Sequence, residues 1–201
     1  MGRNTMEAMD FFRMTEGRWR SQRVTHHLAM RRTELGELQI NATVLPADAP
    51  KVAAICAMHD IDAATAIGGI DINWQGFMAW DADKGQGGAT VMVLVPDQEN
   101  AKSGLLLREK GYAETSPVVG RYLVDDQDGL VLSTEYETMS SVERFSFLSS
   151  TLRFRTSTVL GLSNTASFCV ETLIPDGEED MPPAQALPSN LPACSYSALG
   201  W

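Results

Sequence analysis

Charged side chains alternate with apolar ones between residues 130 and 155, and this alternation could gather several charges on one face of a sheet. Successive side chains of a strand point to opposite faces, and turns at Ser149-Ser150 and Met139-Ser140 would set three strands side by side. One face would then carry Glu135, Glu137, Arg144, Ser146, Arg153 and Arg155. The other face would carry Leu132, Tyr136, Phe145, Phe147, Leu152 and Phe154. Guanidinium groups bind carboxylates through paired hydrogen bonds, so the charged face could hold an acidic ligand.

This charged face has two alternative interpretations. Arg144 would lie opposite Arg155, which is unfavourable unless an anion lies nearby. Glu135 is one candidate anion, and a ligand carboxylate is another. However, any half-exposed sheet carries charges on its solvent side, and buried charges are costly unless they are paired. The pattern alone favours the solvent side and does not decide which face points inward.

Two tryptophans fall in a predicted strand over residues 70–80. Trp74 and Trp80 have the same parity, so they share a face provided that Gly76 does not mark a bulge. Two indoles on one wall could sandwich a flat, conjugated ligand. Ordinary packing in the core is an equally good interpretation of these two residues.

The histidines and serines do not form a recognisable catalytic or metal motif. His26 and His27 are adjacent in a predicted strand, so they point to opposite faces and cannot hold one metal ion together. We therefore expect no metal site. The GxSxG motif of a hydrolase nucleophile is missing from the sequence.

Short strands dominate the elements that must position these residues. Ten segments with turn residues between them have strand character: 17–28, 37–45, 70–80, 89–96, 103–109, 117–124, 129–137, 141–149, 151–160 and 165–174. Two further segments, 5–15 and 47–66, have helical spacing of apolar residues. Strands without intervening helices indicate an antiparallel sandwich or barrel, and a helix between the second and third strands favours a closed barrel.

The composition limits the classes of protein to which the chain can belong. Its 201 residues, 44 % of them hydrophobic, suit one domain over residues 1–174 with a tail. The tail, residues 175–201, is acidic and rich in proline, which predicts a flexible extension. A formal charge of −10 argues against binding to nucleic acid. No stretch is apolar enough for a membrane span, and three cysteines without a CxxC pair favour a reducing compartment.

Several blocks of the chain, over roughly residues 6–174, together resemble the CpcS/CpeS-type (S-type) phycobiliprotein lyases. The blocks are RWRSQR (18–23) followed by HH (26–27), GFMAWD (76–81), LLREKGY (106–112), GRY (120–122), TEYETMSS (134–141) with ERF (143–145), LRFRTS (152–157) and TASFC (165–169). The resemblance implies an all-β fold. It would be a ten-stranded antiparallel lipocalin-like (calycin) barrel with an N-terminal helix and a helical segment between strands two and three.

The resemblance also implies a function. The protein would bind an open-chain tetrapyrrole (phycoerythrobilin or a related bilin) as its substrate, without a prosthetic group. It would deliver the bilin to an apo-phycobiliprotein subunit of phycoerythrin or phycocyanin type, where a cysteine thiol adds to the ring A ethylidene group and forms a thioether. Members are often dimeric. They belong in a cyanobacterial cytoplasm or a plastid, and the tail of this chain slightly favours a plastid. The alternatives are a non-catalytic bilin carrier and a barrel filled by its own side chains.

The resemblance implicates His26, Trp74, Trp80 and Arg153. His26 or Glu135 could protonate the bilin, so these two are the expected catalytic residues. The expected bilin-binding residues are Arg18, Trp74, Trp80, Glu135, Glu137, Arg144, Arg153 and Arg155. Arginines would hold the two propionates and a glutamate would face the pyrrole nitrogens, which now favours the barrel interior for the charged face.

Overall fold

The computed structural model describes residues 6–81, 85–98, 100–109, 117–161, 163–178 and 195–196. The elements, in chain order, are α1 (Ala8–Thr15), β1 (Gly17–His27), η1 (Leu28–Met30), β2 (Arg32–Leu45), α2 (Pro50–Met58), η2 (Ala63–Thr65), β3 (Gly68–Met78), η3 (Ala79–Asp81), β4 (Gln86–Asp97), β5 (Asn100–Arg108), β6 (Val118–Val124), β7 (Leu130–Glu135), β8 (Met139–Ser149), β9 (Leu152–Gly161), β10 (Thr165–Leu173) and β11 (Ser195–Tyr196). Most of the predicted tail and the end of the LLREKGY block lie outside the described residues.

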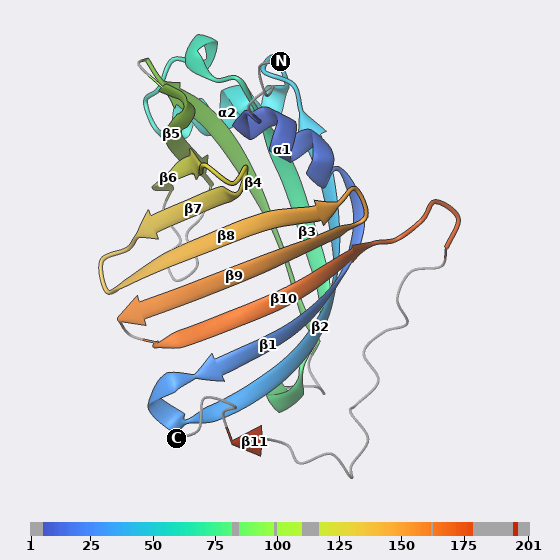
Figure 1. Cartoon of the computed structure of the whole chain (residues 1–201). Helices are drawn as coiled ribbons and strands as arrows, with labels where there is room; N and C mark the ends of the chain where they lie inside the picture. The colour runs from blue at the N-terminus through green and yellow to red at the C-terminus, as the bar shows by residue number, and fades with distance from the viewer. Residues whose placement is uncertain are drawn as a thin grey trace.

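Strands β1 to β10 form a closed antiparallel barrel (Figure 1). Each strand pairs with the next along the chain, and β1 pairs with both β2 and β10, which closes the sheet. The predicted ten-stranded barrel is therefore confirmed. The two-residue strand β11 pairs with β2 at Arg32 and Thr33, beyond the point where β3 ends.

Helix α1 fills one end of the barrel (Figure 1). Its apolar face buries Phe11 and Phe12 against a core that includes Leu94 and Tyr122 from the strands. The helix ends at Thr15, whose carbonyl oxygen accepts a hydrogen bond of 2.9 Å from the indole nitrogen of Trp19. This end of the barrel is thus packed with side chains, and the space that remains lies further along the interior.

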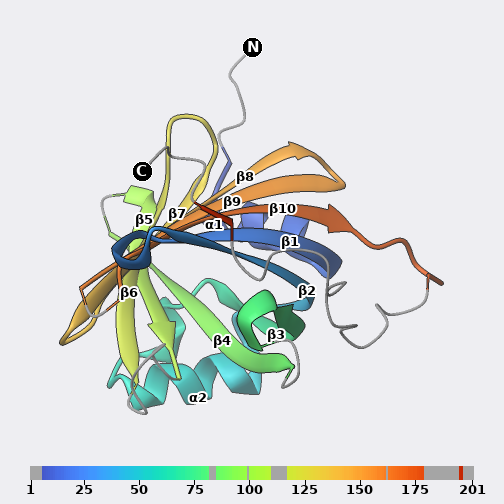
Figure 2. The same ribbon diagram turned by 90° about the horizontal axis from the view of Figure 1, so that it is seen from below.

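Helix α2 packs against the outer surface of β4 and β5 (Figure 2). Its residues Val52 and Ile55 form a second core with Val93 and Leu107, so these two strands are buried on both faces. The predicted helix over residues 47–66 is wrong in length, because Asp60 has a φ of 54° and the left-handed conformation ends the helix. No helix in the described part of the chain is both long and apolar enough to cross a membrane.

The pairing of β8 with β9 differs from the predicted pairing by one residue. Ser149 pairs with Leu152, so the turn lies at Ser150-Thr151, and the register shifts again between Phe147 and Ser149. Phe147 therefore lies opposite Arg153. The irregularity at residue 148 produces this slip of one residue in the pairing. A slip of one residue moves every side chain of a strand to the other face. The predicted turn at Met139-Ser140 is also wrong, since both residues belong to β8.

Candidate ligand site inside the barrel

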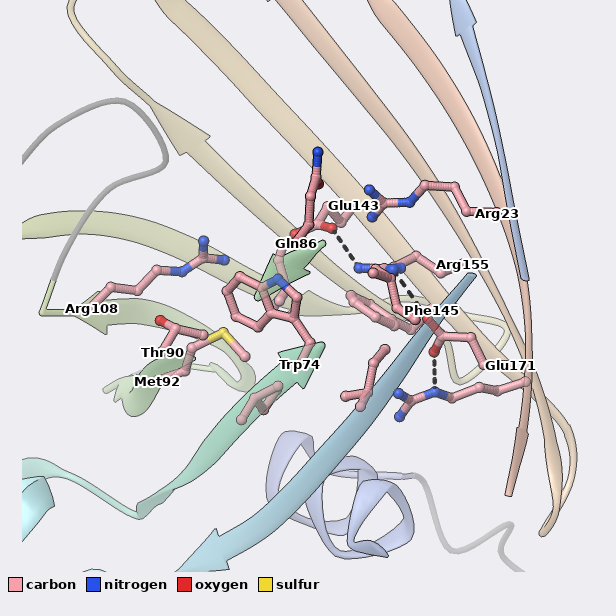
Figure 3. Close-up of a pocket in the computed structure, with 15 residues that line it drawn as sticks. Arg23, Trp74, Gln86, Thr90, Met92, Arg108, Glu143, Phe145, Arg155 and Glu171 are labelled. Atoms are coloured by element: carbon pink, nitrogen blue, oxygen red, sulfur yellow. Dashed lines mark hydrogen bonds and ion pairs between the residues drawn. The ribbon is translucent and has the colours of Figure 1, made fainter. Parts of the chain in front are cut away.

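A cavity of about 130 Å³ lies inside the barrel, beyond helix α1 (Figure 3). Its wall combines aromatic rings with charged groups: Trp74 and Phe145, the arginines Arg23, Arg108, Arg153 and Arg155, and the glutamates Glu143 and Glu171. A second cavity of about 240 Å³ shares Arg23, Gln86 and Glu143 with the first, so the two are neighbouring parts of one interior. The resulting space combines apolar surface with a few charged groups, as ligand pockets commonly do.

Glu171 on β10 joins two arginines of β9 (Figure 3). One carboxylate oxygen, Oε2, accepts a hydrogen bond of 2.5 Å from Nε of Arg153. The other oxygen, Oε1, lies 3.2 Å from Nη2 of Arg155 and accepts a hydrogen bond from Ser21. Arg155 also reaches Oε1 of Glu143 at 3.4 Å. The four charged groups therefore form one connected network along the wall formed by β8, β9 and β10.

Arg153 is held from several sides. Its Nη1 donates a hydrogen bond of 3.0 Å to the hydroxyl of Thr15 at the end of α1. Its guanidinium carbon lies 4.5 Å from the ring centre of Trp19, which is cation–π geometry. Only 2 % of the residue is exposed. The guanidinium of Arg153 thus connects the network of charges to the helix that fills the barrel end.

The network keeps Glu171 ionised although the residue has no solvent exposure. Burial alone would raise the pKa of this carboxyl group. The charges of Arg155 and Arg153, with hydrogen bonds from Arg153 and Ser21, outweigh burial and lower the pKa of Glu171 below its ordinary value. The carboxylate is therefore a permanent negative charge in the barrel wall at neutral pH.

The first cavity has a surplus of positive charge. Four arginines and two glutamates line it, which leaves a formal charge of +2 in a chain whose total is −10. A buried charge needs a partner, because the desolvation of an ion is costly. The cavity is therefore suited to a ligand that carries two carboxylates, and unsuited to a cationic one.

Trp74 provides an aromatic wall opposite the network of charges (Figure 3). Its indole lies over Gly88, its cross-strand partner on β4. A methyl group at position 88 would come within 2.4 Å of the indole carbon Cζ2, so the ring takes this position because residue 88 has no side chain. A flat conjugated ligand could stack on this indole.

Of the residues predicted from the sequence, Trp74, Arg153 and Arg155 come together in the cavity. Their role in binding a bilin remains a prediction. Both arginines share the inner face with Phe145 and Phe147, whereas the sequence pattern predicted that aromatic and charged residues would lie on opposite faces. The error follows directly from the one-residue slip between β8 and β9.

Arg144, Glu135 and Glu137 do not line the described cavities. Arg144 points away from the interior, where its Nε donates a hydrogen bond of 2.7 Å to Asp125 in the turn between β6 and β7. Glu135 is exposed at the end of β7 and pairs with Ser140, whereas the sequence pattern predicted Arg144 as its partner. Glu137 is exposed in the following turn. The carboxylates of the first cavity are Glu143 and Glu171 instead.

Arg18 lies on β1 next to the inward-pointing Trp19 and faces the start of the tail. Its Nη2 donates hydrogen bonds to the backbone oxygens of Pro175 and Glu178, at 3.2 and 2.7 Å. This contact holds the chain immediately after β10 against the barrel. The structure therefore places Arg18 beside the C-terminal segment and not among the residues that line the two cavities.

Trp80 belongs to a group near the β1–β2 hairpin. Strand β3 ends at Met78, so Trp80 lies in η3 and does not continue the wall formed by Trp74. Its ring stacks on His27 with 4.3 Å between centroids. Nε2 of His27 lies 3.0 Å from the carboxylate oxygen Oε2 of Glu34. Glu34 is one of the residues that line the second cavity. His26 points elsewhere, 3.4 Å from the hydroxyl of Thr33.

Four charged residues of the first cavity were not among the predicted site residues: Arg23, Arg108, Glu143 and Glu171. One signal was present in the sequence of β1. Arg23 has the same parity as Trp19 and Ser21, so a tryptophan placed in the core would have predicted that Arg23 points into the barrel. The structure buries Trp19 and Ser21 on that face. Glu143 and Glu171 gave no such signal, because their inward position depends on the register of β8, β9 and β10.

The chain matches known proteins along most of its length. Residues 7–174 match the family described as CpeS-like protein. A protein of Trichodesmium erythraeum named "Chromophore lyase CpcS/CpeS 2" is 50 % identical over 199 residues, which cover 98 % of this chain and 100 % of that protein. A protein of Picosynechococcus named "Phycocyanobilin lyase subunit CpcS" is 50 % identical over 171 residues, 84 % of this chain and 86 % of that one.

A solved structure has the same fold. The S-type phycobiliprotein lyase CPES from Guillardia theta superposes with a TM-score of 0.76 at 29 % sequence identity, covering 85 % of this chain and 94 % of that chain. The Trichodesmium alignment extends past residue 174, so part of the tail is shared with a cyanobacterial relative. The sequence matches and the shared barrel agree: the chain belongs to the family of CpeS-like proteins.

Proposed function

We propose that the protein is a phycobiliprotein lyase, which binds a bilin in the barrel cavity and attaches it to a cysteine of a phycobiliprotein subunit. The observation that carries this proposal is the cavity with a formal charge of +2 beside the indole of Trp74, in a chain of the CpeS-like family. A bilin has two propionates and an extended conjugated plane. The surplus arginine charge suits the propionates, and the indole suits the plane.

The residues of the cavity would act mainly by positioning the bilin. Glu143 and Glu171 are carboxylates that could accept hydrogen bonds from protonated pyrrole nitrogens, the role first expected of Glu135 or Glu137. In the addition, the sulfur of the acceptor cysteine forms a bond to the ethylidene carbon of ring A. The thiol proton passes to the ring carbon at the other end of the double bond, so no oxidant or reductant is needed. Holding the bilin in one orientation would accelerate this step and select its stereochemistry.

A transfer assay tests the proposal. The purified protein is incubated with phycocyanobilin and then with an apo-phycobiliprotein, and the acceptor is denatured in acidic urea. We expect a chromophore that stays on the acceptor and adds the mass of one bilin. A protein that binds bilin but gives transfer no faster or more stereoselective than the spontaneous reaction would be a carrier. Failure to bind any bilin would contradict the proposal.

The proposal also specifies which bilin the protein binds, which type of subunit accepts it and in which compartment the protein acts. We expect phycocyanobilin and a phycocyanin-type subunit, because the Picosynechococcus relative is named a phycocyanobilin lyase subunit. A cyanobacterial cytoplasm is now the expected compartment, because the tail that favoured a plastid aligns with the Trichodesmium protein. A panel of bilins and acceptor subunits in the transfer assay would show the preference.

A homodimer is expected to use exposed apolar side chains on the outside of the barrel. Val142, Leu160 and Phe168 lie on the consecutive strands β8, β9 and β10, and each is at least 41 % exposed. Val142 lies opposite Thr158, two residues from Leu160, and Phe168 lies opposite Thr156, so the three side chains are spread over one stretch of the outer surface. Exposed apolar residues on one surface favour an interface. Light scattering of the purified protein measures the mass in solution, and a monomer at all concentrations would contradict this expectation.

A further inference from the structure

Arg108 is a buried cation without a counter-charge among the residues that the structure describes. It is 7 % exposed and lines the first cavity, yet none of the ion pairs of the described chain includes it. Its Nε atom is buried and has no hydrogen-bond partner in the described part of the chain. A guanidinium group carries a positive charge in proteins. Burying such a charge is costly unless an anion compensates for it.

The two arginines of β9 that line the cavity, Arg153 and Arg155, do have counter-charges. Arg153 has Glu171 at 2.5 Å, and Arg155 is paired with both Glu143 and Glu171. The two glutamates therefore balance the two arginines of β9. The surplus charge of the cavity resides on Arg23 and Arg108, and Arg108 is the more deeply buried of the two.

The backbone that carries Arg108 is fixed from outside the barrel. Nε2 of His59 lies 2.9 Å from the carbonyl oxygen of Arg108. A carbonyl oxygen can only accept, so His59 donates this hydrogen bond. The preceding residue, Leu107, is fully buried in the core beneath α2. The base of the arginine is therefore held in place while its side chain extends into the cavity beside Trp74 (Figure 3).

We propose that Arg108 binds a carboxylate of the ligand and so determines its specificity for acidic molecules. This inference rests on the proposed function, in which the ligand is a bilin and the carboxylate is one of its propionates. A propionate on a plane that stacks against Trp74 would lie in the cavity that the guanidinium group of Arg108 also lines. The ion pair would supply the counter-charge that Arg108 lacks, and it would favour bilins with free propionates over their esters.

Titrations with phycocyanobilin and its dimethyl ester test the inference. The wild-type protein is expected to bind the free acid at least tenfold more tightly than the ester, whose methyl ester groups carry no charge. Arg108→Gln is expected to weaken binding of the free acid by about tenfold, or about 1.4 kcal/mol. It should change binding of the ester little, so the penalty for esterification shrinks in the variant. Arg108→Lys, which keeps the charge, should fall between the two.

Two controls accompany these titrations. Arg121→Gln removes an exposed arginine that pairs with Asp97 on the outside of the barrel, and it should bind both ligands as the wild type does. Circular dichroism and melting temperatures establish that each variant folds. If Arg108→Gln does not fold, Arg108→Lys is the variant whose penalty for esterification is compared with that of the wild type.

Two results would overturn the inference in distinguishable ways. If esterification costs the wild type and Arg108→Gln the same factor, Arg108 does not contact a carboxylate, and the proposed function is unaffected. If the wild-type protein binds neither the acid nor the ester, the proposed function fails and this inference fails with it.

Discussion

Arg153 and Glu171 lie directly across from each other on β9 and β10, and they form an ion pair with at most 3 % of either side chain exposed. The pair lies between the packed end of the barrel, where Thr15 contacts Arg153, and the open cavity, where Arg155 contacts Glu171. Removing one partner of a buried pair leaves the other charge uncompensated. These two residues should therefore affect folding as well as ligand binding.

A double-mutant cycle on this pair should show strong coupling. Arg153→Gln and Glu171→Gln are each expected to lower the free energy of unfolding by about 3–5 kcal/mol, because each leaves a buried charge with fewer partners. The double variant should lose clearly less than the sum of the two single losses. Urea unfolding followed by circular dichroism measures all three. Losses that add to within about 0.5 kcal/mol would mean that the pair is not coupled.

The stabilisation by Glu171 should disappear in acid. The folded-state pKa of Glu171 is lowered, so its contribution is complete above the unfolded value of about 4.3. The contribution is lost as the pH falls from there toward the lower folded pKa. We expect the stability difference between wild type and Glu171→Gln to be constant from pH 7 to 5 and to shrink below about pH 4. Unfolding curves at several pH values measure the difference, and an unchanged gap at pH 3 would contradict the assignment.

A methyl group at position 88 should displace the indole of Trp74. Gly88→Ala would bring Cβ within 2.4 Å of the ring, so the indole has to shift. We expect a changed absorption maximum of bound bilin and a loss of stability of about 1–3 kcal/mol from overpacking. Gly87→Ala is the matched control, because its Cβ would stay 3.3 Å from the backbone oxygen of Trp74 and would not contact the ring. Identical spectra for both variants would place the indole away from the chromophore.

Arg144 should be dispensable for bilin transfer. It lies outside the barrel and pairs with Asp125, whose carboxylate also accepts hydrogen bonds from the backbone of Gln127 and Gly129. Arg144→Gln is therefore expected to cost at most about 1 kcal/mol of stability, as for other partly exposed ion pairs. The rate of chromophore transfer should stay within twofold of the wild-type rate, whereas Arg155→Gln should slow it. A large loss of transfer in Arg144→Gln would show that this face contacts the acceptor or the bilin.

The sequence predicted the fold well because the barrel depends on patterns that are local in the chain. Turn residues between short strands, and the matching sequence blocks, indicated ten antiparallel strands, and all ten are present. Helix lengths were less predictable. The helical spacing of apolar residues predicted one helix over residues 47–66, but the left-handed conformation of Asp60 ends the helix earlier. The periodicity of apolar residues does not reveal such a backbone conformation.

The candidate site was predictable in part. Arg153, Arg155 and Trp74, three of the residues predicted to bind a bilin, line the cavity, and their role in binding stays a prediction. Arg144 does not line it, because the irregularity at residue 148 shifts the pairing of β8 by one residue relative to the expected turn. Strand periodicity repeats every two residues, and it is unchanged when the inner and outer faces are exchanged. A pattern in the sequence therefore cannot show which of the two faces is buried.

By itself, the sequence determined the family and the ten-stranded barrel, and it named Trp74, Arg153 and Arg155 as residues of one site. Only the tertiary structure decided which charges meet inside. Glu171 balances Arg153 and Arg155 because β9 and β10 pair in one particular register. Arg108 enters the same cavity from the opposite wall, carried by a strand that α2 holds in place. These partners are more than 15 residues apart in sequence, and closure of the barrel brings them together, so no local pattern could identify them.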